Sequence, residues 1–150
     1  MLEPLNQFIC DNCGGIIDGV ENGFVEWLVE PETSLNYNFT IVHAPQNPGD
    51  TLGCLQHQPQ SSYIHLEYLM SDEGLIQILW FLDTGLYYAP AYQGPKVKDM
   101  REFVELVRRL KLPYYEEARN YIFDTPDFDH GDELTMYSAL NLRALIETNS

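Results

Sequence analysis

The sequence predicts an α+β protein in which an N-terminal antiparallel β-hairpin or ribbon is followed by a C-terminal bundle of about four helices. Apolar residues alternate with period two in residues 37–43, which is typical of a strand. From residue 63 onward the apolar spacing becomes helical. A chain of 150 residues with 45% hydrophobic content can bury one core, so we expect a single domain with a β part, residues 1–60, and a helical part, residues 61–150.

Two short segments each place a pair of metal-binding side chains on one tight turn. They read CDNC at 10–13 and CLQH at 54–57, and together they contain all three cysteines of the chain. Structural zinc sites use this spacing, because four thiolate or imidazole donors must converge in a tetrahedron. We therefore expect one structural Zn²⁺ per chain that staples the β part. The predicted ligands are Cys10, Cys13, Cys54 and His57.

Residues close to these turns support the site. Gly14 and Gly15 follow the first turn, where positive φ would let backbone amides point toward the thiolates. His43 ends a predicted strand and is an alternative ligand, or a group that contacts a ligand.

Charge divides the chain into two unequal parts. Residues 1–95 contain twelve carboxylates and no Lys or Arg, giving −12, whereas residues 96–150 carry eleven carboxylates and eight bases, giving −3. Nucleic-acid binding requires neutralisation of phosphates by Lys and Arg, so we expect no direct DNA or RNA binding by the N-terminal half. A protein partner with a basic surface is expected instead. The predicted acidic contacts are Glu21, Glu26, Glu30, Glu32 and Asp50.

The two predicted strands lie between the metal-binding turns. Residues 24–30 are rich in aromatic and branched side chains, and Pro31 ends them. Residues 37–43 place Tyr37, Phe39 and Ile41 on one face, and we expect them to pair antiparallel with the first strand.

Helical patterns follow. Residues 72–85 are apolar around most of the helix, which predicts a buried central helix. Residues 97–110 predict an amphipathic surface helix with Arg108 and Arg109 on its polar side, and Pro113 begins another helix at 114–122. The last helix, Leu134 to about Glu147, is apolar on most of its surface, so we place it centrally in the bundle or in a homo-oligomer interface.

Two loops are candidates for binding. Tyr87, Tyr88 and Tyr92 lie on a proline-containing loop and offer contacts for a partner, or they close the core over the end of the preceding helix. The acidic segment Asp127–Glu133 fails the EF-hand spacing, because Gly131 falls at position five of the loop rather than six. A weak Mg²⁺ or Ca²⁺ site and a solvated loop both remain open there.

The segment CDNCGG at 10–15, the strand end IVH at 41–43, the segment CLQH at 54–57 and the helix start DEGL at 72–75 resemble small bacterial proteins with a zinc-ribbon or treble-clef N-terminal half. The resemblance covers about the first 80 residues and implies the ligands Cys10, Cys13, Cys54 and His57. It implies no activity. The long insertion between the two turns departs from the usual ribbon and leaves its subtype open.

These patterns favour a non-catalytic zinc-binding interaction or regulatory protein. One alternative is a zinc-dependent hydrolase, in which an open metal position would activate water, with His57 or His43 nearby and Glu26 as base. Another is an acidic mimic of nucleic acid that inhibits a DNA- or RNA-binding enzyme. The sequence has no membrane span and no basic leader, so we expect a cytoplasmic location.

Overall fold

A central antiparallel sheet organises the first half of the molecule. The computed structural model describes residues 1–46, 53–83, 94–122, 124 and 133–150. Strands β3 (Gly23–Val29) and β4 (Asn36–His43) form the predicted hairpin, and β5 (Ser61–His65) pairs with the other side of β3. A second, smaller sheet consists of β1 (Gln7–Ile9) and β2 (Ile16–Asp18), followed by a short 3₁₀ turn, Val20–Asn22. The predicted α+β class is confirmed.

Strand β5 was not expected, because the sequence predicts helical structure from residue 63. The strand is short and forms by pairing with β3, so its sequence pattern is too brief to be told apart from that of the helix that follows.

A second difference lies in β4. The pairing register shifts beside Asn38, which has a φ of 56°, so Tyr37 faces away from the side that carries Phe39 and Ile41.

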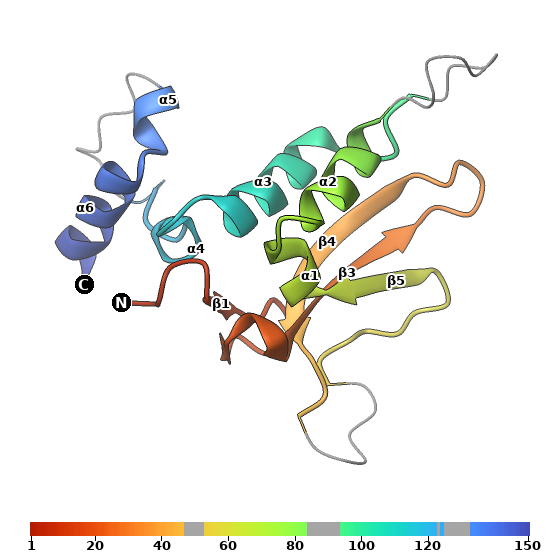
Figure 1. Cartoon of the computed structure of the whole chain (residues 1–150), viewed down its shortest axis with the longest axis horizontal. Helices are drawn as coiled ribbons and strands as arrows, with labels where there is room; N and C mark the ends of the chain where they lie inside the picture. The colour runs from red at the N-terminus through yellow and green to blue at the C-terminus, as the bar shows by residue number, and fades with distance from the viewer. Residues whose placement is uncertain (47–52, 84–93, 123, 125–132) are drawn as a thin grey trace.

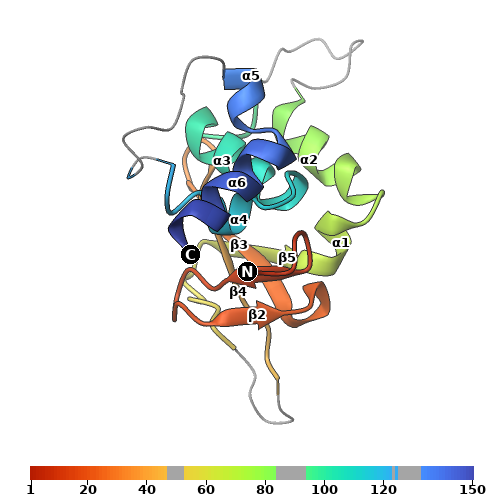
Figure 2. The same ribbon diagram turned by 90° about the vertical axis from the view of Figure 1, so that its left-hand side faces the viewer.

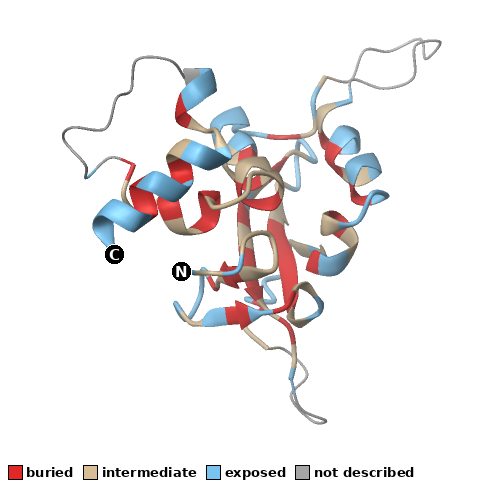
Figure 3. Cartoon of the chain, turned by 60° about the vertical axis from the view of Figure 1, so that its left-hand side comes forward, coloured by how far each residue is buried: buried red, intermediate tan, exposed pale blue. Residues whose placement is uncertain are grey.

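Three helices pack against the sheet: α1 (Leu66–Met70), α2 (Gly74–Leu82) and α3 (Met100–Lys111) (Figure 1). The aromatic rings of Trp27, Phe39, Phe81 and Phe103 meet between them, with ring centroids 5.2 to 5.4 Å apart for the pairs Trp27–Phe81, Phe39–Phe81 and Phe39–Phe103. Figure 3 shows the buried residues along the strands and on the inner sides of the helices.

The prediction that α2 is a buried central helix is wrong. Gly74, Ile78 and Phe81 are buried, whereas Leu75, Ile76, Leu79 and Trp80 are 47 to 66% exposed. The helix contacts the core with one side only, through Ile78 and Phe81. Its apolar residues therefore extend well beyond the face that the core uses.

The C-terminal helices surround a second, smaller core. Helices α4 (Tyr115–Ala118), α5 (Glu133–Met136) and α6 (Ala139–Asn149) lie beyond the end of α3 (Figures 1 and 2). Their core contains Ala118, Ile122, Leu142 and Ile146. The described α-helices thus number six rather than about four; α1, α2 and α3 contribute to the first hydrophobic cluster, and α4 and α6 to the second.

The predicted last helix is two helices. Ser138 lies between α5 and α6, and its hydroxyl accepts a hydrogen bond from the N–H of Asn141 at 3.3 Å, which caps the start of α6. Leu134 and Leu140 are 87 and 78% exposed, so apolar surface remains on both helices. Self-association through this apolar surface stays a prediction.

Within the described parts of the chain, no helix is long and apolar enough to cross a membrane.

Candidate metal centre

Three cysteines and one histidine converge at the end of the central sheet. One ligand atom from each of Cys10, Cys13, His43 and Cys54 lies within 4.8 Å of the others. The Nδ1 atom of His43 lies 3.4 Å from Sγ of Cys13 and 3.8 Å from Sγ of Cys54. In a tetrahedral zinc site an Sγ and an imidazole nitrogen stand roughly 3.6 Å apart, as follows from the usual Zn–S and Zn–N bond lengths. The four residues are positioned to bind a metal ion.

The His43 ring is oriented as a metal ligand requires. Its Nε2 atom lies 3.1 Å from the carbonyl oxygen of Ile16. A carbonyl can only accept a hydrogen bond, so Nε2 is the donor in this contact, and Nδ1 is the ring nitrogen that faces the sulfurs. Partners of this kind fix the orientation of histidine ligands in metal sites.

The fourth donor is thus the alternative histidine of the sequence analysis. His57 lies outside the cluster that the structure brings together. Its ring packs edge-on toward Tyr63, with ring centroids 6.1 Å apart, and its φ of 49° turns the chain at this point. Strand β4 instead delivers His43 from its last position, opposite Gly23.

The first metal-binding turn is a compact backbone loop. The N–H of Gly14 donates to the Cys10 carbonyl at 2.9 Å, and the N–H of Cys10 donates to the Gly15 carbonyl at 2.8 Å. Gly14 has a φ of 74°, and the N–H of Gly15 points at Sγ of Cys13 at 3.4 Å. This is the arrangement predicted for the two glycines.

The second turn is held by a buried carboxylate of the sheet. Glu26 is 3% exposed, and its two oxygens accept the N–H of Gln56 at 2.9 and 3.1 Å, while the N–H of His57 donates to Oε2 at 3.2 Å. Gly53 packs directly on β4, since an added Cβ would lie 2.5 Å from the carbonyl oxygen of His43. These contacts place Cys54 beside His43.

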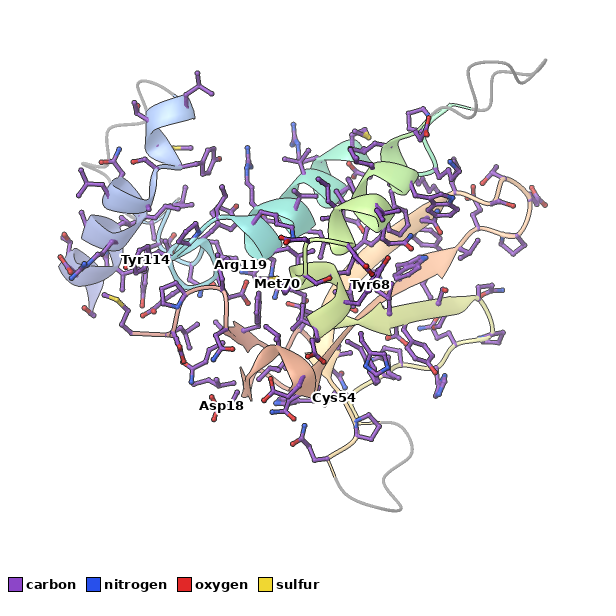
Figure 4. The ribbon with its side chains drawn as sticks, viewed as in Figure 1. Asp18, Cys54, Tyr68, Met70, Tyr114 and Arg119 are labelled. Atoms are coloured by element: carbon purple, nitrogen blue, oxygen red, sulfur yellow. The ribbon has the colours of Figure 1, made fainter. Side chains whose placement is uncertain are left out.

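Side chains also link the two turns. The Nδ2 group of Asn12 donates to the Cys54 carbonyl at 3.3 Å, and Nε2 of Gln56 donates to Oδ1 of Asn12 at 2.8 Å. The residues between the ligands therefore fasten one turn to the other. Figure 4 labels Cys54 at the lower end of the sheet, where the turns meet.

The thiols of the cluster differ in acidity. Burial opposes ionisation of Cys10, but hydrogen bonds from the backbone of Cys13, His43 and Asn12 outweigh it and lower the pKa of Cys10 to about 7. Burial, together with the neighbouring Cys10 sulfur, raises the pKa of Cys54 to about 11. A bound cation favours the thiolate form of every cysteine ligand, so metal binding would release protons.

One residue of the first turn reaches into the helical part. The N–H of Ile41 donates to Oδ2 of Asp11 at 2.7 Å, and the same oxygen accepts Nη1 of Arg109 at 2.6 Å. Arg109 is 4% exposed, whereas the sequence placed it on the polar side of its helix. Sequence reasoning missed this residue because a helical wheel shows charge without showing what packs against it.

The predicted acidic contact set is dispersed. Glu26 cannot belong to an exposed surface, because it is buried under the second turn. Glu30 pairs with Lys98 at 2.6 Å, whereas Glu21 and Glu32 are exposed. Asp50, Tyr87, Tyr88 and Tyr92 lie outside the described residues, as do positions 127–132 of the acidic loop.

Comparison with known proteins gives no relative from which a function could be inferred. No protein-family model, curated protein or solved structure matches this chain. The site must therefore be interpreted from its own geometry.

Proposed function

We propose that this chain is a non-catalytic zinc-binding protein that acts by binding a protein partner. The observation that carries the zinc assignment is the cluster of three sulfurs and one correctly oriented imidazole nitrogen. Thiolate and imidazole donors suit Zn²⁺, whereas Mg²⁺ and Ca²⁺ take oxygen ligands.

The same donor count argues against hydrolysis. Structural zinc sites use four protein ligands, and catalytic sites keep a position for water. The cluster supplies four donors, so a tetrahedral ion would have no open position. Glu26, the base that a hydrolase would need, has both oxygens bonded to backbone N–H groups of the second turn. Its environment supports a role in shaping the turn.

Metal analysis and X-ray absorption of the purified chain test the zinc assignment. We expect one zinc per chain with three sulfur neighbours and one nitrogen neighbour, and loss of the metal from Cys13→Ser. Protein that contains no zinc would overturn the assignment. A water ligand on the metal would overturn the non-catalytic interpretation and favour the hydrolase.

An apolar groove between α2 and α3 supports partner binding. Its volume is about 240 Å³. Leu75 and Leu79 fall within about 60° of Leu82 on the helical wheel, so they extend the groove along the exposed side of α2. Continuous apolar surface of this kind marks interaction sites. The apolar lining residues are Ile78, Leu82, Met100, Phe103, Val104, Val107 and Leu112, and Arg108 and Lys111 line the groove beside them.

The occupant that we propose is an apolar segment of a partner protein with net positive charge. A second copy of this chain fits poorly, because each copy carries −15 and the copies repel one another. A basic partner is attracted by the net field of the whole chain. The groove itself is lined by apolar side chains together with Arg108 and Lys111, so the segment that enters it is apolar and the basic groups of the partner lie outside it. Nucleic acid is disfavoured, because residues 1–95 contain no Lys or Arg.

Affinity capture with three variants tests this surface. Leu79→Glu places a charge beside the groove, Val104→Glu places one in its lining, and Leu140→Glu makes the same change at an exposed leucine of α6. We expect a partner that the wild type and Leu140→Glu retain, that both groove variants lose, and that high salt weakens. Equal retention by all four proteins would overturn the assignment. A dimer in sedimentation that Val104→Glu dissociates would identify a second copy as the occupant.

A further inference from the structure

The first metal-binding turn is connected to the C-terminal helices through one buried guanidinium. Arg109 of α3 donates from Nε to Oε2 of Glu116 at 2.7 Å and from Nη2 to Oε1 at 2.8 Å. Its Nη1 donates to Oδ2 of Asp11 at 2.6 Å, and Nη2 also donates to the Ile9 carbonyl at 3.1 Å. Arg109 therefore joins the residues around the first ligand, Cys10, to helix α4.

Asp11 belongs to the first turn and is also hydrogen-bonded to strand β4. It lies between two ligands, Cys10 and Cys13, and its backbone N–H donates to the Ile41 carbonyl at 2.8 Å. The carboxylate that accepts the N–H of Ile41 is the one that faces Arg109. If the turn opened, a guanidinium that is 4% exposed would lose one of its two carboxylate partners. Glu116 would still pair with the guanidinium, but Nη1 would lose its carboxylate acceptor, and an unsatisfied buried donor costs free energy.

Helix α4 makes further polar contacts with the N-terminal residues. The N–H of Ile9 donates to Oε1 of Glu116 at 2.9 Å, and the N–H of Leu2 donates to a carboxylate oxygen of Glu117 at 2.6 Å. Arg119 reaches Oδ1 of Asp11 at 3.5 Å (Figure 4 labels Arg119 beside α4). Helices α4 and α6 belong to a hydrophobic cluster separate from that of the sheet. They are attached to the rest of the molecule by the polar contacts with residues 2–11 and by contacts with Glu105 and Arg108 of α3.

We propose that metal occupancy controls how firmly the α4–α6 unit is held, through Asp11, Arg109 and Glu116. The metal fixes the first turn, the turn fixes Asp11, and Asp11 provides the acceptor for Nη1 of the guanidinium that anchors α4. Loss of the metal loosens the turn and, through it, helices α4 and α6. This inference rests on the metal binding proposed above, and it adds a regulatory role to a site that would otherwise only stabilise the sheet.

Hydrogen exchange of the full-length chain, with zinc bound and after chelation, tests the coupling. We expect chelation to speed exchange of the α4 and α6 amides by roughly tenfold or more, which lies within the usual range of coupling between sites. Asp11→Asn removes the negative charge that faces Nη1 of Arg109. The amides of α4 and α6 should therefore already exchange fast with zinc bound, and their exchange rates should change little on chelation. Amides of residues 7–18 should still respond in this variant.

The matched control is Asp18→Asn. Asp18 is an exposed carboxylate at the end of β2 that accepts Nε2 of Gln7 at 2.9 Å, and its variant should respond to chelation as the wild type does. If Asp11→Asn folds poorly, Arg119→Gln removes the 3.5 Å contact with Asp11, together with the contacts of Arg119 to Glu105 at 3.4 Å and to Glu116 at 3.8 Å, and it should reduce the response partly.

The outcomes separate the two proposals. Protein that holds zinc but exchanges equally at α6 with and without it overturns the coupling and leaves the zinc site intact. An equal response at every helix and strand, unchanged in Asp11→Asn, also overturns the coupling, because it reports global unfolding. Protein without zinc overturns the metal assignment.

Discussion

The two metal-binding turns look alike in sequence and are built differently. The turn at residues 10–13 supplies two ligands, closes on itself through backbone hydrogen bonds around Gly14, and sends Asp11 outward to the helical part. The turn at residues 54–57 supplies one ligand and is held from outside, by Glu26 and by the packing of Gly53 on β4. The first turn has its own backbone hydrogen bonds in addition to those that Asp11 makes with Ile41 of β4, whereas the second turn is held by groups of the sheet.

The largest effect is expected at the histidine that β4 contributes. His43→Ala removes one of four donors, so the chain should lose its metal and a stabilisation on the order of several kcal/mol. Metal content and the midpoint of thermal unfolding measure this. A variant that retained one zinc per chain at wild-type stability would show that His43 is not a ligand.

Removal of the carboxylate that supports the second turn should come next. Glu26→Ala leaves the N–H groups of Gln56 and His57 without their acceptor, and we expect a loss of about 2–4 kcal/mol. Urea unfolding of the zinc-loaded protein measures it. The control is Glu32→Ala, at an exposed acidic position, with an expected change within about 0.5 kcal/mol. Equal losses in the two variants would contradict the role given to Glu26.

A pair of glycine substitutions compares the turns directly. Gly53 has a φ of 54°, and an added Cβ would meet the His43 carbonyl oxygen at 2.5 Å, so Gly53→Ala should cost about 1–3 kcal/mol. At Gly15 the nearest atoms would lie at 3.4 Å, which is ordinary contact, and the backbone does not require glycine. Gly15→Ala should therefore be milder in the same urea measurement. The reverse order would mean that the first turn is the more constrained one.

The sequence predicts those parts of this molecule in which a local pattern decides the structure. Alternation along residues 37–43 was enough to predict the β3–β4 hairpin, and the three cysteines identified the centre. The fourth ligand depends on tertiary structure, because the spacing CLQH suggests His57, whereas the position of Glu26 decides how the second turn is oriented. Arg109 was missed for the same reason, since its partners are remote in sequence.

The smallest effect is expected at His57, and it separates the two possible ligand sets most sharply. His57→Asn removes the imidazole but keeps a residue that tolerates the φ of 49° found there. The variant loses only the edge-on contact with Tyr63, so we expect unchanged zinc content and a stability loss below about 1 kcal/mol. Because His43→Ala removes the donor whose Nδ1 lies 3.4 Å from Sγ of Cys13, the two histidine variants should differ in metal content as well as in stability. If zinc were lost from His57→Asn and kept by His43→Ala, the second turn would supply two ligands. The two turns would then be as alike in structure as they are in sequence.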